Sequence, residues 1–320
     1  MKLLFTHTDL DGAGCRVLFE IANRDRPYRV VRATPFTIEN VVRNTVGDLT
    51  SPALKLKIEE IFFADICPQM STISELKDAG HKVKVFDHHQ TNSNMNVFPD
   101  LCIVSEVGGV KQSGTNLLCE ALQANGVLPS CGLIDEFAET VRSYDTFEWK
   151  ETDDIKAKKL QTLFVMMGID RFCEHYIDRL SNFSEKSLID PKFEELIDAR
   201  LEQEERIISS FSPRDVHDMN IAGYNTAVVL NNKGCNISDI AYEFLRKYTE
   251  YDAMIGVSFA HGGGAYALRS AREDVNVAKI AEALGSGGHA TAAGAGMSAS
   301  ALRRIVGIIE EDLKRAERRE

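Results

Sequence analysis

The sequence predicts an α/β protein of two domains: a doubly wound, mainly parallel sheet, and a smaller α/β domain joined to it by a helical linker. Three observations support this. Apolar runs of strand length alternate with helical patterns in the first part of the chain, and several of these runs end on acidic or imidazole residues. The pattern changes to closely spaced strands after residue 213, and 320 residues suffice for two separate cores.

The first part of the chain supplies the predicted parallel sheet. We expect its strands at Lys2–Thr6, Arg29–Ala33, Glu60–Ala64, Val83–Phe86 and Leu101–Ser105. Helices are predicted after Gly14 and at Pro68–Ala79, Asn116–Gln123, Glu136–Tyr144, Lys156–Met167, Phe172–Leu180 and Lys192–Ser209. Strands that alternate with helices favour parallel pairing with right-handed crossovers. The last helix is dense in glutamate and arginine, which is typical of a solvated face or an interdomain spacer.

The Phe211-Ser212-Pro213 stretch indicates a domain boundary. Beyond it, strands are predicted at Met219–Gly223, Thr226–Leu230, Ala253–Phe259 and Gly264–Arg269, and helices at Ser238–Tyr248, Val275–Leu284 and Ala299–Arg315. We therefore expect a catalytic domain at 1–185, a helical linker at 186–213 and a smaller domain at 214–320.

Composition narrows the class of protein. A net charge of −11 argues against a protein that coats long duplex DNA, because such binding needs basic surface, but it allows short substrates. The seven cysteines are scattered and form no Cys-x-x-Cys pair, so neither a disulfide framework nor a zinc ribbon is predicted. The chain shows no signal segment and no membrane-spanning run, and we expect a cytoplasmic protein.

The first predicted strand ends in a segment rich in metal-ligand types, His7-Thr8-Asp9-Leu10-Asp11-Gly12. His7, Asp9 and Asp11 stand at every second position, so an extended chain would point them to the same side. The alternative is that Asp11 caps the following helix, an arrangement that needs no metal.

Two further strands end on similar residues, Asp65 and Asp87-His88-His89. The carboxyl ends of parallel strands share one edge of the sheet, which is where open α/β sheets bind ligands. Imidazole and carboxylate together suit a divalent transition metal, and Asp87 could instead fix a histidine tautomer. Neighbouring histidines at a strand end are also common as plain polar surface.

Three other positions could have either a functional or a purely structural role. Asp145, beside Phe147 and Trp149, is either a ligand or a loop aspartate. Ser113 and Thr115 either cap a helix or offer hydroxyls to a phosphate.

The second domain contains a glycine-rich segment, Gly285-Ser286-Gly287-Gly288-His289-Ala290-Thr291-Ala292-Ala293-Gly294. Glycines allow close backbone approach, and free amides can meet an anion. With His289 inside this segment and Arg269 at the end of a nearby strand, we expect a phosphate-binding site.

The ordered segments resemble a known family. His7-x-Asp9-x-Asp11-Gly12, Asp65, Asp87-His88-His89 and Asp145 resemble the four motifs of the DHH phosphoesterases, and Gly285–Gly294 is similar to the GGGHxxAAG signature of the DHHA1 domain. The resemblance covers nearly the whole chain. Within the family, the chain looks most like the small bacterial oligoribonucleases (nanoRNases), although Thr8, Ser286 and Ala267 differ from residues common in relatives. His7 also lies two residues before Asp9, where several relatives have a spacing of four.

This resemblance implies a site for two divalent metal ions, normally manganese. Carried over by position, one ion would take His7, Asp9 and Asp65, and the other Asp11, Asp65, His88 and Asp145. Two ions roughly 3.5 to 4 Å apart can hold a bridging hydroxide for in-line attack on a phosphate ester. His89 would then face the scissile phosphate as a donor, and Asp87 would orient a ligand histidine. Arg269 and His289, with Gly287 and Gly288, would hold the distal phosphate or sugar of the substrate.

The leading hypothesis is a manganese-dependent exoribonuclease that hydrolyses very short single-stranded RNA to mononucleotides. Alternatives are an adenosine 3′,5′-bisphosphate phosphatase, a linear or cyclic dinucleotide phosphodiesterase, and a catalytically silent nucleotide-binding regulator. An inorganic pyrophosphatase is disfavoured, because that branch has a different second domain. The sequence leaves open the cleavage direction, the preference for RNA or DNA, and whether the chain forms a homodimer.

Overall fold

The computed structural model describes residues 1–89, 92, 101–152, 154–182, 186–221, 223–230, 235–260, 263–272, 274–305 and 307. The chain forms two compact units, Met1–Glu202 and Gln203–Glu320, each with its own sheet. The division falls inside helix α9 (Glu194–Ser209). The two-domain α/β class is confirmed, whereas the separate linker at 186–213 stays a prediction.

The sheet of the first unit is parallel throughout, with strand order β2-β1-β3-β4-β5. Its strands are β1 (Lys2–Thr6), β2 (Tyr28–Arg32), β3 (Glu60–Ala64), β4 (Lys82–Asp87) and β5 (Leu101–Ile103). The chain leaves β1 for β2 on one side and returns to β3 on the other, so the order reverses between β1 and β3. Ligands of open α/β sheets bind at such a reversal, beyond the carboxyl ends of the strands.

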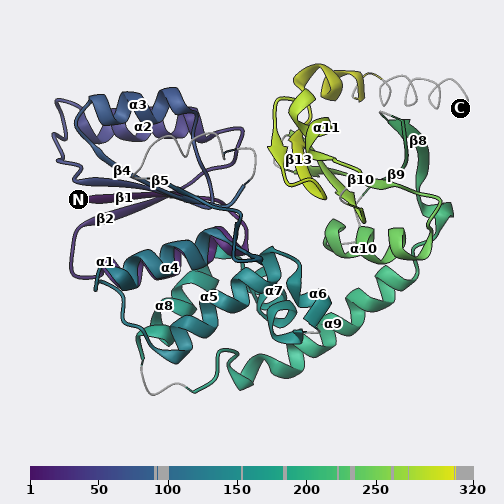
Figure 1. Ribbon diagram of the computed structural model, residues 1–320, viewed down its shortest axis with the longest axis horizontal. Helices are drawn as coiled ribbons and strands as arrows, with labels where there is room; N and C mark the ends of the chain where they lie inside the picture. Colours follow the sequence, from purple (N-terminus) through teal and green to yellow (C-terminus); the bar gives the residue numbers. More distant parts are fainter. Residues whose placement is uncertain are drawn as a thin grey trace, which may run out of the picture. The chain divides into compact units, whose positions relative to one another are not determined.

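Helices cover both faces of this sheet (Figure 1). One face carries α2 (Ile38–Thr50) and α3 (Met70–Asp78), which pack on alternate strand residues such as Leu3 and Phe5. The other face packs Leu4 and Phe62 against a larger helical layer. That layer contains α1 (Leu10–Asn23), α4 (Gly114–Ala124), α5 (Gly132–Asp145), α7 (Ile155–Met167) and α8 (Ile169–Ser181). The predicted doubly wound arrangement is therefore confirmed.

Three elements of this unit were not predicted. They are α2, the short helix α6 (Glu148–Thr152) and a hairpin of β6 (Glu106–Val107) and β7 (Val110–Lys111). The buried residues of α2 do have helical spacing, at Ile38, Val42 and Leu49. The hairpin turns on two glycines with left-handed φ angles of 58° and 85°.

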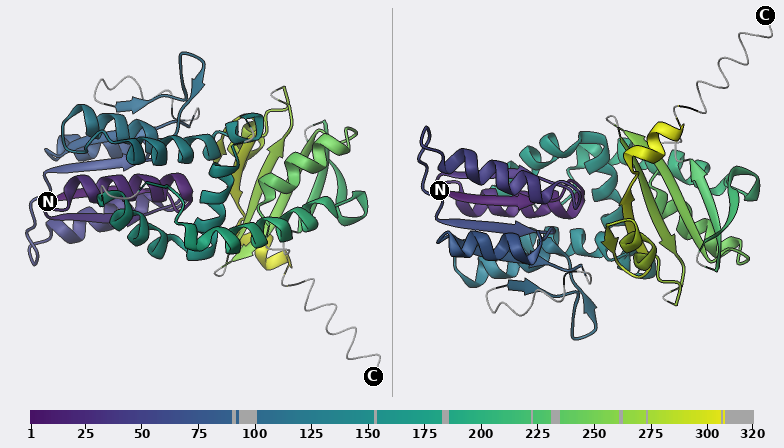
Figure 2. Two further views of the ribbon diagram at one scale, coloured as in Figure 1. Left: turned by 90° about the horizontal axis from the view of Figure 1, so that it is seen from below. Right: turned by 90° about the horizontal axis from the view of Figure 1, so that it is seen from above.

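The second unit is built on a mixed six-stranded sheet of order β12-β13-β11-β10-β9-β8, in which only the β9–β10 pairing is parallel. Figure 2 shows this sheet in green and yellow. Its strands are β8 (His217–Ile221), β9 (Tyr224–Leu230), β10 (Ala253–Ala260), β11 (Gly263–Ser270), β12 (Gly287–Gly288) and β13 (Ala292–Gly296). The helices α10 (Ile237–Lys247) and α11 (Ala278–Ala283) pack in two separate apolar clusters. The predicted helix Ala299–Arg315 is helical at 299–305 and 307, and its other positions lie outside the described residues.

None of the helices in the described part of the chain combines the length and the apolar character needed to span a membrane.

Candidate metal centre

The chain turns sharply between β1 and α1. Asp9 is the N-cap of α1, and its Oδ1 accepts a hydrogen bond of 3.0 Å from the backbone N–H of Gly12. Asp11 lies in the first helical turn, so both the extended chain predicted through Asp11 and the alternative of an Asp11 cap are wrong. A side chain at Gly12 would put its Cβ 2.4 Å from the carbonyl oxygen of His7, which explains why the turn needs glycine.

A first cluster of metal-ligand types nevertheless forms at this turn. The ligand atoms of His7, Asp9 and Asp65 all lie within 4.8 Å of one another. His7 Nδ1 is 2.6 Å from Asp9 Oδ2 and 3.8 Å from Asp65 Oδ2. Asp65 Oδ2 is buried and has no hydrogen-bond partner in the described part of the chain. A buried carboxylate oxygen without a donor is costly, and a cation would remove that cost.

A second cluster shares Asp65 with the first. Its ligand atoms, from Asp11, Asp65 and His88, also lie within 4.8 Å of one another. His88 Nε2 is 3.4 Å from Asp65 Oδ1, 3.7 Å from Asp11 Oδ2 and 3.3 Å from Asp145 Oδ2. Asp65 thus turns one oxygen toward His7 and the other toward His88, which is the arrangement that a bridging ligand requires. The two clusters contain the residues that the family resemblance implies except Asp145, which lies beside the second cluster through His88, and the role of these residues as ligands stays a proposal.

The backbone at Asp65 is held in an unusual conformation. Its φ angle is 57°, in the left-handed region, which aspartate tolerates better than most residues. The backbone N–H of Asp65 donates to the carbonyl of Phe86 at 2.9 Å. Gly114 packs directly on it, since a Cβ at Gly114 would lie 2.7 Å from both the Cβ and the N of Asp65. The start of α4 therefore fixes the position of the shared carboxylate.

The same helix start holds Asp11. The backbone N–H groups of Gly114 and Thr115 donate to Asp11 Oδ2 and Oδ1 at 2.6 and 2.8 Å, and Thr115 Oγ1 donates to the Asp11 carbonyl at 2.7 Å. The amino end of a helix favours negative charge, which stabilises this buried carboxylate. Ser113 caps α4 in a capping box with Asn116, so its capping role is confirmed. Thr115 instead ties α4 to α1.

Asp87 is fully buried and saturated by hydrogen bonds. Its Oδ1 accepts from the backbone N–H of His88 at 3.0 Å and from His89 Nδ1 at 2.7 Å, and its Oδ2 accepts from Asn92 Nδ2 at 2.6 Å. Asp87 was expected to orient a ligand histidine. The histidine side chain that it orients is instead His89.

Burial and neighbouring charges shift the pKa values of the carboxylates and histidines of the site. Burial, followed by the neighbouring carboxylates, raises the pKa of Asp65 and of Asp145 well above its usual value. Burial and the charge of His89 lower the pKa of His88, which favours the neutral imidazole that a metal ligand needs. Burial acts to lower the pKa of His89, but the charge of Asp87 and its hydrogen bond outweigh it and raise the pKa to about 9. The centre is short of positive charge around Asp65, as expected for a cation site.

The predicted substrate residues of the second unit lie on β11 and β12, the two strands that flank β13, or directly after β12. Arg269 on β11 donates from Nε to Ser238 Oγ at 2.7 Å and from a terminal nitrogen to the Leu268 and Ala293 carbonyls. Arg269 pairs with Ala292 on β13, and the backbone N–H of His289 donates to the Ala292 carbonyl at 2.7 Å. Gly287 and Gly288 form β12, where Gly288 has a φ of 146° and a Cβ would lie 2.6 Å from the Ala292 carbonyl oxygen. The structure brings these residues together, and their substrate role stays a proposal.

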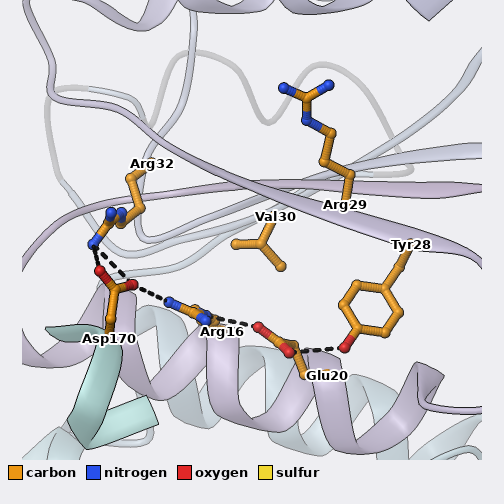
Figure 3. Close-up of a pocket in the computed structure, with 7 residues that line it drawn as sticks. All are labelled: Arg16, Glu20, Tyr28, Arg29, Val30, Arg32 and Asp170. Atoms are coloured by element: carbon orange, nitrogen blue, oxygen red, sulfur yellow. Dashed lines mark hydrogen bonds and ion pairs between the residues drawn. The ribbon is translucent and has the colours of Figure 1, made fainter. Parts of the chain in front are cut away.

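A hollow of about 350 Å³ on the first unit contains none of the predicted site residues (Figure 3). Five of its lining residues are joined by hydrogen bonds and ion pairs: Arg16, Glu20, Tyr28, Arg32 and Asp170. Glu20 accepts hydrogen bonds from Tyr28 Oη at 2.8 Å and from Arg16 Nε at 2.7 Å, and Arg16 also bonds Asp170 at 2.7 Å. This network joins α1, β2 and α8, which indicates a structural role.

Comparison with known proteins agrees with this architecture. Residues 224–315 match the DHHA1 domain. The fold, the two clusters and this match confirm the predicted resemblance to the DHH/DHHA1 phosphoesterases.

Among its relatives is the oligoribonuclease NrnB of Bacillus subtilis (strain 168), which is 28% identical over 301 residues, covering 92% of this chain and 72% of that protein. Two solved structures have a similar fold. One is the pGpG-specific phosphodiesterase PggH of Vibrio cholerae, with a TM-score of 0.52, 14% identity, and 98% and 99% of the two chains covered. The other is the DHH domain of a member of a family of ribosomal proteins, with a TM-score of 0.59, 14% identity, and 98% and 86% covered.

The contact between Gly114 and Asp65 predicts the effect of Gly114→Ala. The added Cβ would collide with backbone atoms of Asp65, which cannot move aside cheaply. We expect affinity for Mn²⁺ to fall by about 10- to 100-fold, the range typical of lost support around a metal site. Calorimetric titration measures this. The control is Gly132→Ala, which also changes the first residue of a helix but meets no atom within 4 Å. Equal affinity in both variants would contradict the proposed support.

Proposed function

We propose that this protein is a manganese-dependent phosphodiesterase that hydrolyses very short RNA to mononucleotides. The observation that carries the proposal is Asp65, a buried carboxylate shared by two ligand clusters, with one oxygen that lacks a hydrogen-bond donor in the described structure. A DHHA1 domain in the same chain supplies a second group of anion-binding residue types.

The residues fit a pair of divalent cations. His7, Asp9 and Asp65 would hold one ion, and Asp11, Asp65, His88 and Asp145 the other, as the two clusters suggest. The chemistry that two such ions supply is neutralisation of phosphoryl charge and activation of water. Carboxylate and imidazole ligands suit manganese, among other divalent ions.

The remaining residues of the centre would bind and orient the phosphate of the substrate. In the metal-free site Asp87 raises the pKa of His89 to about 9 and holds the ring by a hydrogen bond of 2.7 Å to Nδ1. A protonated imidazole held by a carboxylate makes a strong, directed hydrogen bond to a phosphate oxygen. We assign this task to His89 and its orientation to Asp87. Arg269 and His289 would hold the phosphate or sugar at the far end of the substrate.

The relatives support a small nucleic-acid substrate. One is named an oligoribonuclease, and a protein of similar fold is described as a pGpG-specific phosphodiesterase. The net charge of −11 disfavours long polyanions, since affinity for them comes from basic surface. The scattered cysteines, with no Cys-x-x-Cys pair, are the reason for expecting a reducing cytoplasm.

The first test is an activity panel with manganese. It compares 5′-labelled RNA and DNA from dinucleotides to 24-mers, adenosine 3′,5′-bisphosphate, cyclic dinucleotides and pyrophosphate. We expect RNA turnover to fall steeply beyond about five nucleotides, because a substrate that is held at both ends must fit a fixed length. Efficient processive degradation of the 24-mer would defeat the proposal. Turnover of the bisphosphate or of a cyclic dinucleotide alone would favour those alternatives.

Asp65→Ala tests the shared carboxylate. We expect turnover to be abolished and the manganese content to drop below that of any variant of a ligand that serves a single ion, because Asp65 would serve both. Elemental analysis after purification with manganese measures the content. Asp87→Asn is the comparison and should cost only about 10- to 100-fold in activity or metal affinity. Two tightly held ions in Asp65→Ala would rule out the bridging role.

Arg269→Ala tests the distal anchor. It should raise KM for short RNA and leave hydrolysis of a small chromogenic phosphodiester nearly unchanged, because the small ester does not reach the anchor. Steady-state kinetics on both substrates measure this. Equal losses on the two substrates would show that Arg269 supports the fold or the metal centre instead.

A further inference from the structure

Arg142 is a buried cation that joins three elements of the first unit. Its side chain is only 4% exposed, although it carries a permanent charge. Within α5, its Nε and Nη2 donate to the two carboxylate oxygens of Glu139 at 2.8 and 2.5 Å. Its Nη1 donates to Glu148 on α6 at 2.7 Å and to the carbonyl of Lys111 on β7 at 2.9 Å. One planar guanidinium therefore links α5 to α6 and to the hairpin of β6 and β7.

The hairpin that Arg142 holds leads directly into the helix start that supports the metal centre. The capping box of α4 begins two positions after Lys111. Gly114 follows it, and its backbone N–H donates to Asp11 Oδ2 at 2.6 Å. Gly114 also packs on the backbone of Asp65. The hydrogen bond from Arg142 to Lys111 thus acts on the segment that fixes two carboxylates of the site.

The other contacts of Arg142 fix the turn that carries Asp145. Asp145 is the last residue of α5, and Glu148 is the first residue of α6. Between them, Thr146 donates from its backbone N–H and from Oγ1 to the Arg142 carbonyl, each at 2.9 Å. A residue at the end of a helix is held weakly by the helix itself, so its position depends on such contacts. Asp145 Oδ2 lies 3.3 Å from His88 Nε2 in this arrangement.

A gain in stability does not account for this network. A buried ion pair stabilises a fold little, because the loss of hydration offsets the attraction, and apolar residues of similar volume often do as well. What a guanidinium supplies and an apolar residue does not is a set of donors in a rigid, planar arrangement. Arg142 uses these donors to hold three elements in one register.

We propose that Arg142 is a positioning residue that holds Asp145 in register with the start of α4, and thereby with the carboxylates that α4 supports. This proposal rests on the proposed function and adds to it a residue that would contact neither ion. Asp145 would serve only the second ion, together with Asp11, Asp65 and His88. Its displacement should therefore weaken the binding of that ion and spare the first, whereas a general loss of stability would weaken both.

The test compares the two carboxylate partners of Arg142. Glu148→Ala removes the link to α6, whereas Glu139→Ala removes an equal charge from the same guanidinium but leaves the links to α6 and to the hairpin. We expect Glu148→Ala to lower the affinity for the second Mn²⁺ ion by about tenfold, the low end of the range for lost support around a metal site. Glu139→Ala should leave both affinities near wild type. Calorimetric titration of the metal-free protein measures the two affinities, and electron paramagnetic resonance distinguishes a coupled pair of ions from a single ion.

Arg142→Met removes all of these links at once and fills most of the same space with a flexible apolar side chain. It should show the same selective loss of the second ion, larger than in Glu148→Ala, and the two glutamate variants decide the outcome even if Arg142→Met does not fold. Equal affinities in Glu148→Ala and Glu139→Ala, or an equal loss of both ions in Glu148→Ala, would overturn the positioning role. Failure of the wild-type protein to bind a pair of Mn²⁺ ions would instead overturn the proposed function, so the two failures are distinguishable.

Discussion

The first unit is organised around the cost of keeping carboxylates together out of water. Asp65 is buried and meets the charges of Asp9, Asp11 and Asp145, and its pKa is raised first by burial and then by these neighbours. An uncompensated buried charge is among the most expensive features that a fold can contain. The cluster persists because the elements that carry it are fixed by extensive apolar cores on both faces of the sheet.

The charge of each carboxylate in the cluster is stabilised by different donors, and Asp65 has fewer than Asp9, Asp11 or Asp87. Asp11 receives two backbone N–H groups from the start of α4, and Asp87 receives His89, Asn92 and a backbone N–H. Asp9 is held by His7 and Gly12, and these contacts lower its pKa although burial opposes the change. One oxygen of Asp65 receives no donor within the described structure. The protein thus compensates Asp9, Asp11 and Asp87 itself, while Asp65 depends on a proton or a cation.

Much of this could be predicted from the sequence, and the limit has a physical origin. The bounds of β1 and β3 were predicted to the residue, because a buried apolar run that ends on polar side chains has few other interpretations. Parallel strands share an edge, so Asp9, Asp65 and His88 were expected together. The cap was not predictable, because Gly12 packing on the His7 carbonyl decides whether Asp9 or Asp11 begins the helix. The hydrogen bond from the Gly114 backbone N–H to Asp11 could not be predicted either, since it joins residues that are 103 positions apart in the sequence.

The residues with left-handed φ angles show where the surrounding structure overrides local preference. Among the described non-glycine residues, those with left-handed φ are Lys55, Asp65 and Phe147, and two of these three belong to or adjoin the metal centre. Asp65 directly follows the end of β3, and Phe147 follows the end of α5. Both left-handed φ angles therefore occur just outside regular elements. Strain of this kind persists only where the surrounding structure determines the conformation. Gly114 provides that constraint for Asp65 through a direct backbone contact. For Phe147, the hydrogen bond of 3.2 Å from its backbone N–H to the Tyr144 carbonyl and the contact of its ring with Trp149 contribute to that constraint.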